Sequence, residues 1–284
     1  MAMRTRGYAR RRQAYRAGSQ GRRAANSRPM KYLARAGLVA RGIMYAVIGW
    51  IALQIAFGKT HQLADRSGAL HELSSTPFGA AALWLLVVGF FGLTLWRLSE
   101  VLYGVPGSGG RASSSRLASL ARAVIYAIIG YGVLKYALGE GTPQSTNQQS
   151  VDLTATLLRH NGGQAVAVII GFGLAALGCY LGYQYWRKEF LSDLQLGRMR
   201  ARTRRIVERL GQVGGVARGI VFVTAGIFLV VAAVKAQPGE AKGIDSSLRA
   251  LAGTPLGPWL LVAVAIGLIM FGVFSCCEAR WRRV

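Results

Sequence analysis

The chain contains few of the residues that build disulfides, metal sites and acid–base catalysts. Its 284 residues include three cysteines, three histidines and 11 acidic residues. Cys179, Cys276 and Cys277 all fall inside apolar stretches, which argues against a disulfide framework and favours a role as small packing residues.

Catalytic and cofactor-binding motifs are also missing. The sequence has no His-Glu-x-x-His, no Gly-x-Ser-x-Gly and no phosphate-binding glycine loop. The histidines, which share no repeat position and have no zinc-ligand spacing, are His61, His71 and His160. We therefore predict no catalytic residue, no metal site and no cofactor, and we expect the protein not to be an enzyme.

Basic and apolar residues, in contrast, are abundant. Lys and Arg number 35, the formal net charge is +24, and hydrophobic residues make up 52% of the chain. The apolar residues gather into long blocks, and most basic residues lie in the gaps between them. A nucleic-acid-binding protein would need the charge but not the blocks, so we do not expect a nucleic acid as the partner.

Six of the blocks have the length and hydrophobicity of membrane-spanning helices. They cover residues 37–57, 80–102, 118–138, 164–186, 214–234 and 257–278. Residues 1–31 form a basic tail without the apolar core of a signal peptide, and we expect this tail to be disordered. The sequence therefore predicts an all-α polytopic membrane protein.

The basic residues are divided unequally between the two sets of loops. Segments 1–36, 103–117, 187–213 and 279–284 hold 24 of them, and the three remaining loops hold six. Because basic loops stay on the cytoplasmic side of a membrane, we expect both termini to be cytoplasmic.

A short motif recurs in the first, third and fifth spans. Each copy has an Ala-Arg pair, an aromatic residue four positions after the arginine and a glycine eight positions after it. The copies are Arg41, Tyr45 and Gly49; Arg122, Tyr126 and Gly130; and Arg218, Phe222 and Gly226. This spacing puts each set on one face of its helix.

The second and sixth spans also resemble each other. Thr76-Pro77-Phe78-Gly79 recurs as Thr254-Pro255-Leu256-Gly257, and Glu100 is matched by Glu278 at the same offset. The fourth span has diverged, because Gly182 stands at the position aligned with the two glutamates.

Each loop between the two spans of a pair holds a short amphipathic segment, which begins at Ser67, Ser150 or Asp245. The repeat unit is therefore a span, a surface helix and a second span. The three units cover residues 32–104, 116–190 and 214–284. Three units of one orientation favour a pseudo-threefold bundle, and three hairpins in an open row are the alternative.

The pattern Ala-Arg-Gly-x-x-Tyr-x-x-x-Gly, used three times across six spans, resembles the bacterial membrane family called domain of unknown function 1206. The matching segments extend over residues 32–284. The resemblance implies a six-helix protein of the bacterial inner membrane, and it implies no particular activity.

The embedded arginines have two interpretations. In the first, they form ion pairs that clamp the helices together, Arg41 with Glu100 and Arg218 with Glu278. The protein is then a non-enzymatic membrane component, structural or lipid-interacting, and another membrane protein is a candidate partner.

In the second interpretation, an arginine binds an anion. Arg122 lacks an acidic partner in the fourth span, so Arg122 and Tyr126 form a candidate site for a lipid phosphate or a small anionic solute. If all three arginines converge, beside Tyr45 and Phe222, they would line the positive vestibule of a transporter or channel for an anionic solute.

Residues 191–213, between the fourth and fifth spans, are rich in arginine. Leu196, Met199, Ile206 and Leu210 share one helical face, and arginines share the other. The pattern predicts a basic amphipathic helix on the membrane surface, with anionic phospholipids of the cytoplasmic leaflet as its partners.

Overall fold

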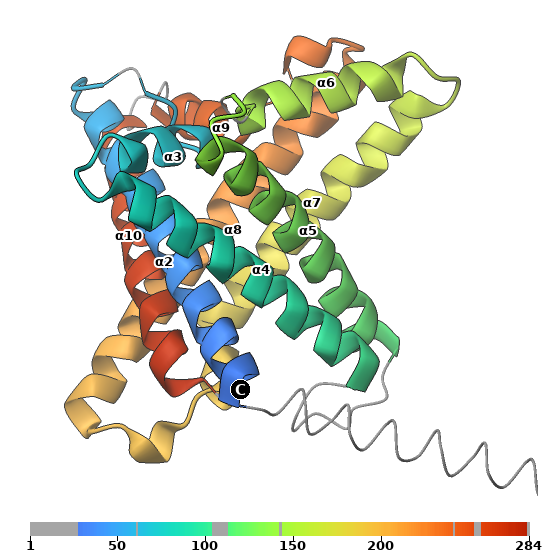
Figure 1. Cartoon of the computed structure of the whole chain (residues 1–284). Helices are drawn as coiled ribbons and strands as arrows, with labels where there is room; N and C mark the ends of the chain where they lie inside the picture. Colours follow the sequence, from blue (N-terminus) through green and yellow to red (C-terminus); the bar gives the residue numbers. More distant parts are fainter. Residues whose placement is uncertain are drawn as a thin grey trace, which may run out of the picture.

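The protein is built from helices, and its long helices form one bundle (Figure 1). The structure is a computed structural model that describes residues 28–60, 62–103, 113–141, 144–240, 242–252 and 257–282. The long helices are α2 (Arg28–Ala56), α4 (Gly79–Tyr103), α5 (Ser113–Ala137), α7 (Gly163–Trp186), α8 (Ala201–Val234) and α10 (Gly257–Trp281). Shorter helices are α3 (Arg66–Ser74), α6 (Thr146–Leu158) and α9 (Ile244–Ala252).

All six long helices are long and apolar enough to cross a membrane. The predicted all-α protein with six spans is thus confirmed within the described residues. Residues 1–27, which make up most of the predicted basic tail, lie outside them. We call the end of the bundle with α3, α6 and α9 the short-helix end, and the end where α2 begins and α10 ends the terminal end.

The structure differs from the prediction in the segment before the fifth span. Residues 191–213 do not form one surface helix, because two 3-10 turns, Glu189–Asp193 and Leu196–Arg198, precede α8. Helix α8 then runs without a break from Ala201 through the fifth span. The reason is packing: Leu194 and Val207 are buried against aromatic side chains of α10 instead of facing lipid.

The long helices pack in a cyclic order. Helix α2 packs on α4, α4 on α5, α7 on α8, α8 on α10, and α10 on α2. In the described residues, α5 and α7 share no comparable interface, although both belong to the middle repeat. The bundle is therefore a pseudo-threefold ring that is open between α5 and α7. It is not a row of three hairpins, because the middle hairpin is split.

Two interfaces between neighbouring repeats are built from glycines in the same way. A Cβ atom on Gly42 of α2 would lie 2.7 Å from the carbonyl oxygen of Gly272 in α10. A Cβ atom on Gly219 of α8 would lie 2.8 Å from the carbonyl oxygen of Gly178 in α7. Only glycine allows the two backbones to approach this closely. The first helix of one repeat is thus joined to the second helix of the preceding repeat.

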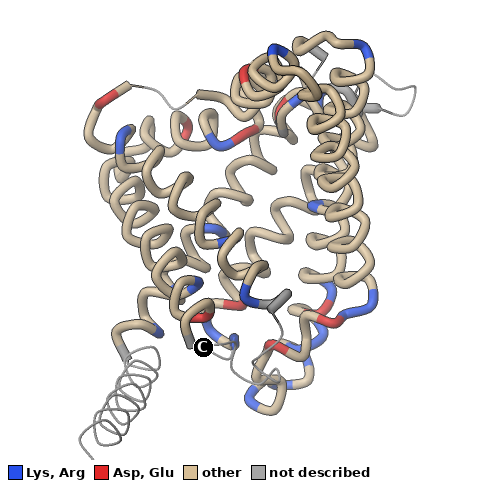
Figure 2. Tube along the Cα trace, turned by 90° about the vertical axis from the view of Figure 1, so that its right-hand side faces the viewer, with Lys and Arg blue, Asp and Glu red and all other residues tan. Residues whose placement is uncertain are grey.

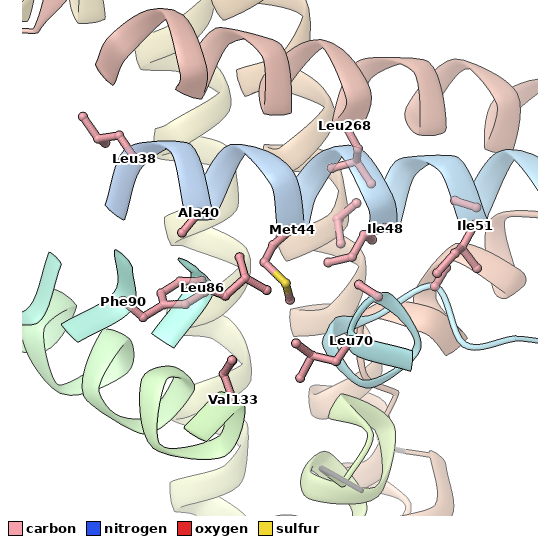
Figure 3. Close-up of a cluster of buried hydrophobic side chains, with 14 of the residues drawn as sticks. Leu38, Ala40, Met44, Ile48, Ile51, Leu70, Leu86, Phe90, Val133 and Leu268 are labelled. Atoms are coloured by element: carbon pink, nitrogen blue, oxygen red, sulfur yellow. The ribbon is translucent and has the colours of Figure 1, made fainter. Parts of the chain in front are cut away.

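The largest apolar core surrounds α2 (Figure 3). Ile48 and Ile51 of α2, Leu86 of α4 and Leu268 of α10 are almost wholly buried there. Leu70 of α3 closes the core at the short-helix end. Burial of such side chains makes α2 the central helix, since 56% of its most apolar stretch is buried, against 17% for α7.

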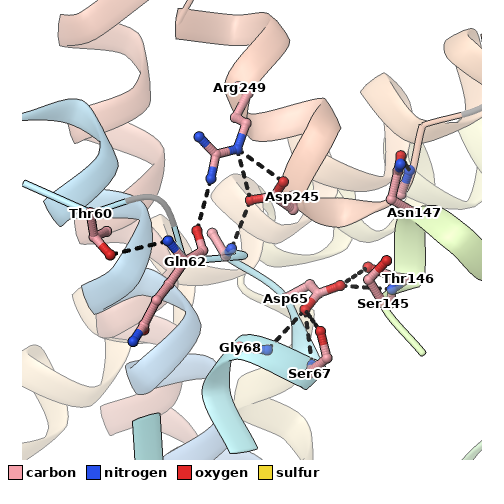
Figure 4. A network of polar contacts seen from close by, with 12 residues as sticks. Thr60, Gln62, Asp65, Ser67, Gly68, Ser145, Thr146, Asn147, Asp245 and Arg249 are labelled. Carbon is pink, nitrogen blue, oxygen red and sulfur yellow. Dashed lines mark hydrogen bonds and ion pairs between the residues drawn. The ribbon is translucent and has the colours of Figure 1, made fainter. Parts of the chain in front are cut away.

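Hydrogen bonds join the three loops of the short-helix end in cyclic order, and Figure 4 shows those of Asp65 and Asp245. In each bond, a side-chain oxygen of one repeat accepts from a backbone N–H of the next repeat: Asp65 from Thr146 (2.7 Å), Asn147 from Gly243 (3.2 Å) and Asp245 from Ala64 (2.7 Å). Asp65 and Asp245 are buried. We call this set the loop ring; it ties all three repeats together at one end of the bundle.

Gly178→Leu should lower the free energy of unfolding in detergent by about 1–3 kcal/mol, because the new side chain would push α7 away from α8. Gly173→Leu, in the same helix, is the matched control, since no atom lies within 4 Å of a Cβ atom at that position. Equal losses of stability in the two variants would contradict the close packing of α7 on α8.

Asp65→Ala should lower the stability of the protein by about 2–4 kcal/mol, because it removes both the cap of α3 and the bond to Thr146. Asp152→Ala is the control, because the Asp152 carboxylate is exposed and, among the described residues, accepts from Gln148 of its own helix alone. Chemical unfolding of both variants in detergent measures the difference.

Candidate functional site

Arg41 of α2 forms a buried ion pair with Glu278 of α10. Its Nε donates to the hydroxyl of Ser275 at 3.3 Å, and Glu278 also accepts from Arg282 Nη1 at 2.9 Å. The expected pair of Arg41 with Glu100 is therefore wrong. Glycine contacts bring α2 close to both α4 and α10, so they do not select the partner. Glu100 is already paired with an arginine of its own helix, whereas Glu278 lies beside Arg41.

Glu100 of α4 has other partners. Arg97 Nη1 donates to its carboxylate at 2.6 Å, and the Ser119 hydroxyl of α5 donates at 3.0 Å. Arg122 is exposed on α5; it lies within electrostatic range of Glu100 but pairs directly with no described carboxylate. Glu100, the residue of α4 that corresponds to Glu278, thus forms its ion pair with Arg97 of its own helix.

Arg218 of α8 lies among aromatic rings. Its guanidinium carbon is 5.1 Å from the ring centre of Phe271, 5.3 Å from that of Phe222 and 5.5 Å from that of Tyr45. Its Nε is buried and has no hydrogen-bond partner among the described residues. Contacts between a cation and aromatic rings are worth about 0.5–2 kcal/mol each, so they do not replace a counterion.

Because the fourth span has no carboxylate, Arg218 is the arginine that lacks its acidic partner. The sequence predicts this for Arg122, and that prediction is wrong. Helix α7 packs on α8, so the residue that stands for the glutamate faces the arginine of the third repeat. The expected pair of Arg218 with Glu278 is also wrong, because Glu278 is engaged by Arg41.

The glycine contacts identify the residue that replaces the acid. Glu278 comes six residues after Gly272 in α10, and Gln184 comes six residues after Gly178 in α7. Gln184 therefore stands at the position where the interface between α2 and α10 has its carboxylate.

Gly182, the residue expected there, is displaced from that position by two residues. The amide of Gln184 donates to the hydroxyl of Tyr180 at 2.9 Å, within its own helix. A neutral amide cannot balance a guanidinium charge, and no carboxylate among the described residues forms an ion pair with Arg218.

A cavity of about 350 Å³ adjoins Arg218 inside the bundle. Helices α2, α6, α7, α8 and α10 and the segment before α9 line it, and the described residues of α4 and α5 contribute nothing to its wall. Arg218 and Tyr45 lie at one end, and Lys242 and Thr146 lie at the other. The Lys242 amine is 4.0 Å from the ring centre of Phe228.

The charged residues surround this interior unevenly. Figure 2 shows that most of them gather toward the two ends of the bundle, with few along the middle of the long helices. Tyr126 of α5 lies close to Arg41 and within electrostatic range of Arg97 and Arg218, so arginines from different repeats approach one centre. Its ring packs against Phe90 at 6.3 Å.

Comparison with known proteins places the chain in a family. A profile described as "Domain of Unknown Function (DUF1206)" matches residues 36–104, 117–188 and 213–282. The chain belongs to this family. The three matched segments correspond to α2–α4, α5–α7 and α8–α10, so each DUF1206 repeat is one pair of spans with its short helix.

One relative is the "Uncharacterized protein YxxB" of Bacillus subtilis (strain 168). It is 28% identical to this DUF1206 chain over 257 residues, which cover 90% of this chain and 92% of the relative. No solved structure matches the chain.

The structure thus brings together Arg41 with Glu278, and Arg218 with Tyr45 and Phe222. Sequence reasoning missed the residues that redirect or replace these contacts, namely Arg97, Ser119, Gln184, Lys242, Ser275 and Arg282. The ion pair of Arg97 with Glu100 was predictable, because the two residues are three positions apart on one face of a helix. The position of Gln184 was also predictable. It follows Gly163, the first residue of α7, by the same spacing that separates Gly79 from Glu100 and Gly257 from Glu278.

Arg41→Gln should lower the free energy of unfolding by about 3–5 kcal/mol, because it leaves the buried Glu278 carboxylate without its interhelical partner. Arg218→Gln should lower it by less than about 1 kcal/mol or raise it, because it removes an unbalanced charge. Unfolding of both variants in the same detergent, without added anions, checks the contrast. Equal destabilisation would show that Arg218 has an internal counterion.

Proposed function

We propose that this DUF1206 protein is an integral membrane protein whose central cavity binds an anionic ligand. The observation that carries the proposal is Arg218, a cation with a buried, unpartnered Nε on the wall of the cavity. Arg218 is half-buried beside an apolar wall, where water solvates its charge less well than at an open surface. An anion in the cavity would neutralise that charge and recover the missing hydrogen bond.

The composition of the cavity wall supports binding over catalysis. The described residues that line it include no Asp, Glu, His or Cys, the side chains that most often act as general acids, bases or nucleophiles. Its two charged residues, Arg218 and Lys242, are both cations. We therefore infer a non-enzymatic, lipid-interacting or anion-binding membrane component.

We place the protein in the bacterial inner membrane with both termini in the cytoplasm. The basic segments support this orientation, because they alternate with the loops that carry the short helices. The arginine-rich start of α8 lies at the terminal end, where anionic phospholipid headgroups and another membrane protein are its candidate partners.

A transporter for an anionic solute is the second candidate. It is supported by the approach of Arg41 and Arg218, from different repeats, to the Tyr126 side chain. Transport requires access from both sides, however, and the buried loop ring lies across the short-helix end. Binding is the function that the closed ring favours.

The test measures the melting temperature in a nonionic detergent as inorganic phosphate or, separately, phosphatidylglycerol is added. We expect at least one of these anions to raise it, since a ligand at 100 times its Kd contributes about 2.7 kcal/mol. Arg218→Gln should abolish the rise. Gln184→Glu should also abolish it, because the new carboxylate would pair with Arg218.

Arg202→Gln is the control, since Arg202 is exposed on the same helix and should not affect the rise. The proposal fails if neither anion raises the melting temperature, or if the rise is the same in the Arg218→Gln and Arg202→Gln variants.

A further inference from the structure

Most of the cavity wall is apolar. Side chains such as Ile48, Leu174 and Leu268 line it between Arg218 at one end and Lys242 at the other. A small hydrated anion would bind the arginine and gain nothing from this wall, whereas a hydrocarbon chain would fill it favourably. The ligand that suits both parts has an acidic group and an apolar body.

The cavity also has a side that the ring of helices leaves uncovered. Helix α7 contributes Ile170 and Leu174 to the wall, while the described residues of α5 contribute none. These two helices share no comparable interface, and Ile170 is 41% exposed although it lies on the cavity wall. The cavity therefore opens sideways, between α5 and α7.

The helices beside this opening present apolar side chains to their surroundings. Ile128 of α5 is 59% exposed and Phe172 of α7 is 63% exposed. Since α5 and α7 have the composition of membrane-spanning helices, these side chains meet lipid chains in a bilayer. The opening thus leads into the hydrocarbon region.

Helix α6 lies across the short-helix end, above the ends of α5 and α7 (Figure 1). It lines the cavity with polar side chains, among them Gln149 and Ser150, and the loop ring holds its first residue, Thr146. Leu153 of α6 also lines the cavity and is 53% exposed, so α6 covers this end only in part. The route with apolar walls is the lateral one, beside Ile170 and Leu174.

We propose that the ligand is an anionic membrane lipid. Its acidic group binds Arg218, and its acyl chain passes Leu174 and leaves between α5 and α7 into the bilayer. This inference rests on the anion-binding function proposed above and names the class of ligand and its route of entry.

The experiment uses native mass spectrometry of the detergent-purified full-length chain with added phosphatidylglycerol or phosphatidylcholine of identical acyl chains. We expect phosphatidylglycerol to bind at least about tenfold more tightly than phosphatidylcholine. Arg218→Gln and Leu174→Trp should each weaken its binding by about tenfold or more. Leu177→Trp, one turn away, exposed and absent from the cavity wall, is the matched control and should bind normally.

Equal binding of the two lipids, or equal weakening by Leu174→Trp and Leu177→Trp, would overturn the lipid assignment. If inorganic phosphate stabilises the protein in an Arg218-dependent manner while phosphatidylglycerol does not bind, the anion-binding function stands and the lipid inference falls. If neither binds, both proposals fail.

A second measurement does not depend on the tryptophan variant. A nitroxide attached to Leu174→Cys, with Cys179, Cys276 and Cys277 replaced by alanine, reports collisions with oxygen and with a water-soluble nickel chelate in liposomes. Frequent collisions with oxygen and few with nickel support a cavity open to the bilayer. The opposite pattern shows a cavity open to water and contradicts the lateral route.

Discussion

Close contact between glycine backbones of neighbouring repeats is the interaction on which the rest of the structure depends. Gly42 meets Gly272, and Gly219 meets Gly178, at distances that exclude a Cβ atom. These contacts hold helices of neighbouring repeats together in a fixed register. At the interface of α2 with α10, that register places Arg41 beside Glu278.

The three equivalent interfaces differ in charge, and that difference localises the candidate site. One has an interhelical ion pair, one has its carboxylate turned to Arg97 and Ser119, and one has Gln184 where the acid would stand. The neutral interface leaves Arg218 beside the cavity. In the described residues, the two long helices of the same middle repeat share no interface comparable with that of the other repeats, so the unbalanced charge and the lateral opening occur on the same part of the ring.

The sequence predicts the six spans, the threefold repeat and the position of one arginine in the first, third and fifth spans. It does not predict which acidic residue pairs with each of these arginines. Arg41 and Glu278 are separated by 237 residues, and no local pattern indicates that their helices touch. The error at Gly182 has a different cause. Matching Gly171 to Gly89 within the helices places Gly182 opposite Glu100, whereas matching the first residues of the helices, Gly163 and Gly79, places Gln184 there.

Hydrophobic length, charge distribution and helical periodicity are local properties, and they alone determined that this protein is an all-helical chain with six spans, three repeats and an arginine within three of the spans. The tertiary structure decided which arginine has a counterion, where a cavity remains and on which side it opens. These features depend on contacts between helices far apart in the sequence, where a single glycine or one turn of helix changes the partner of a buried charge.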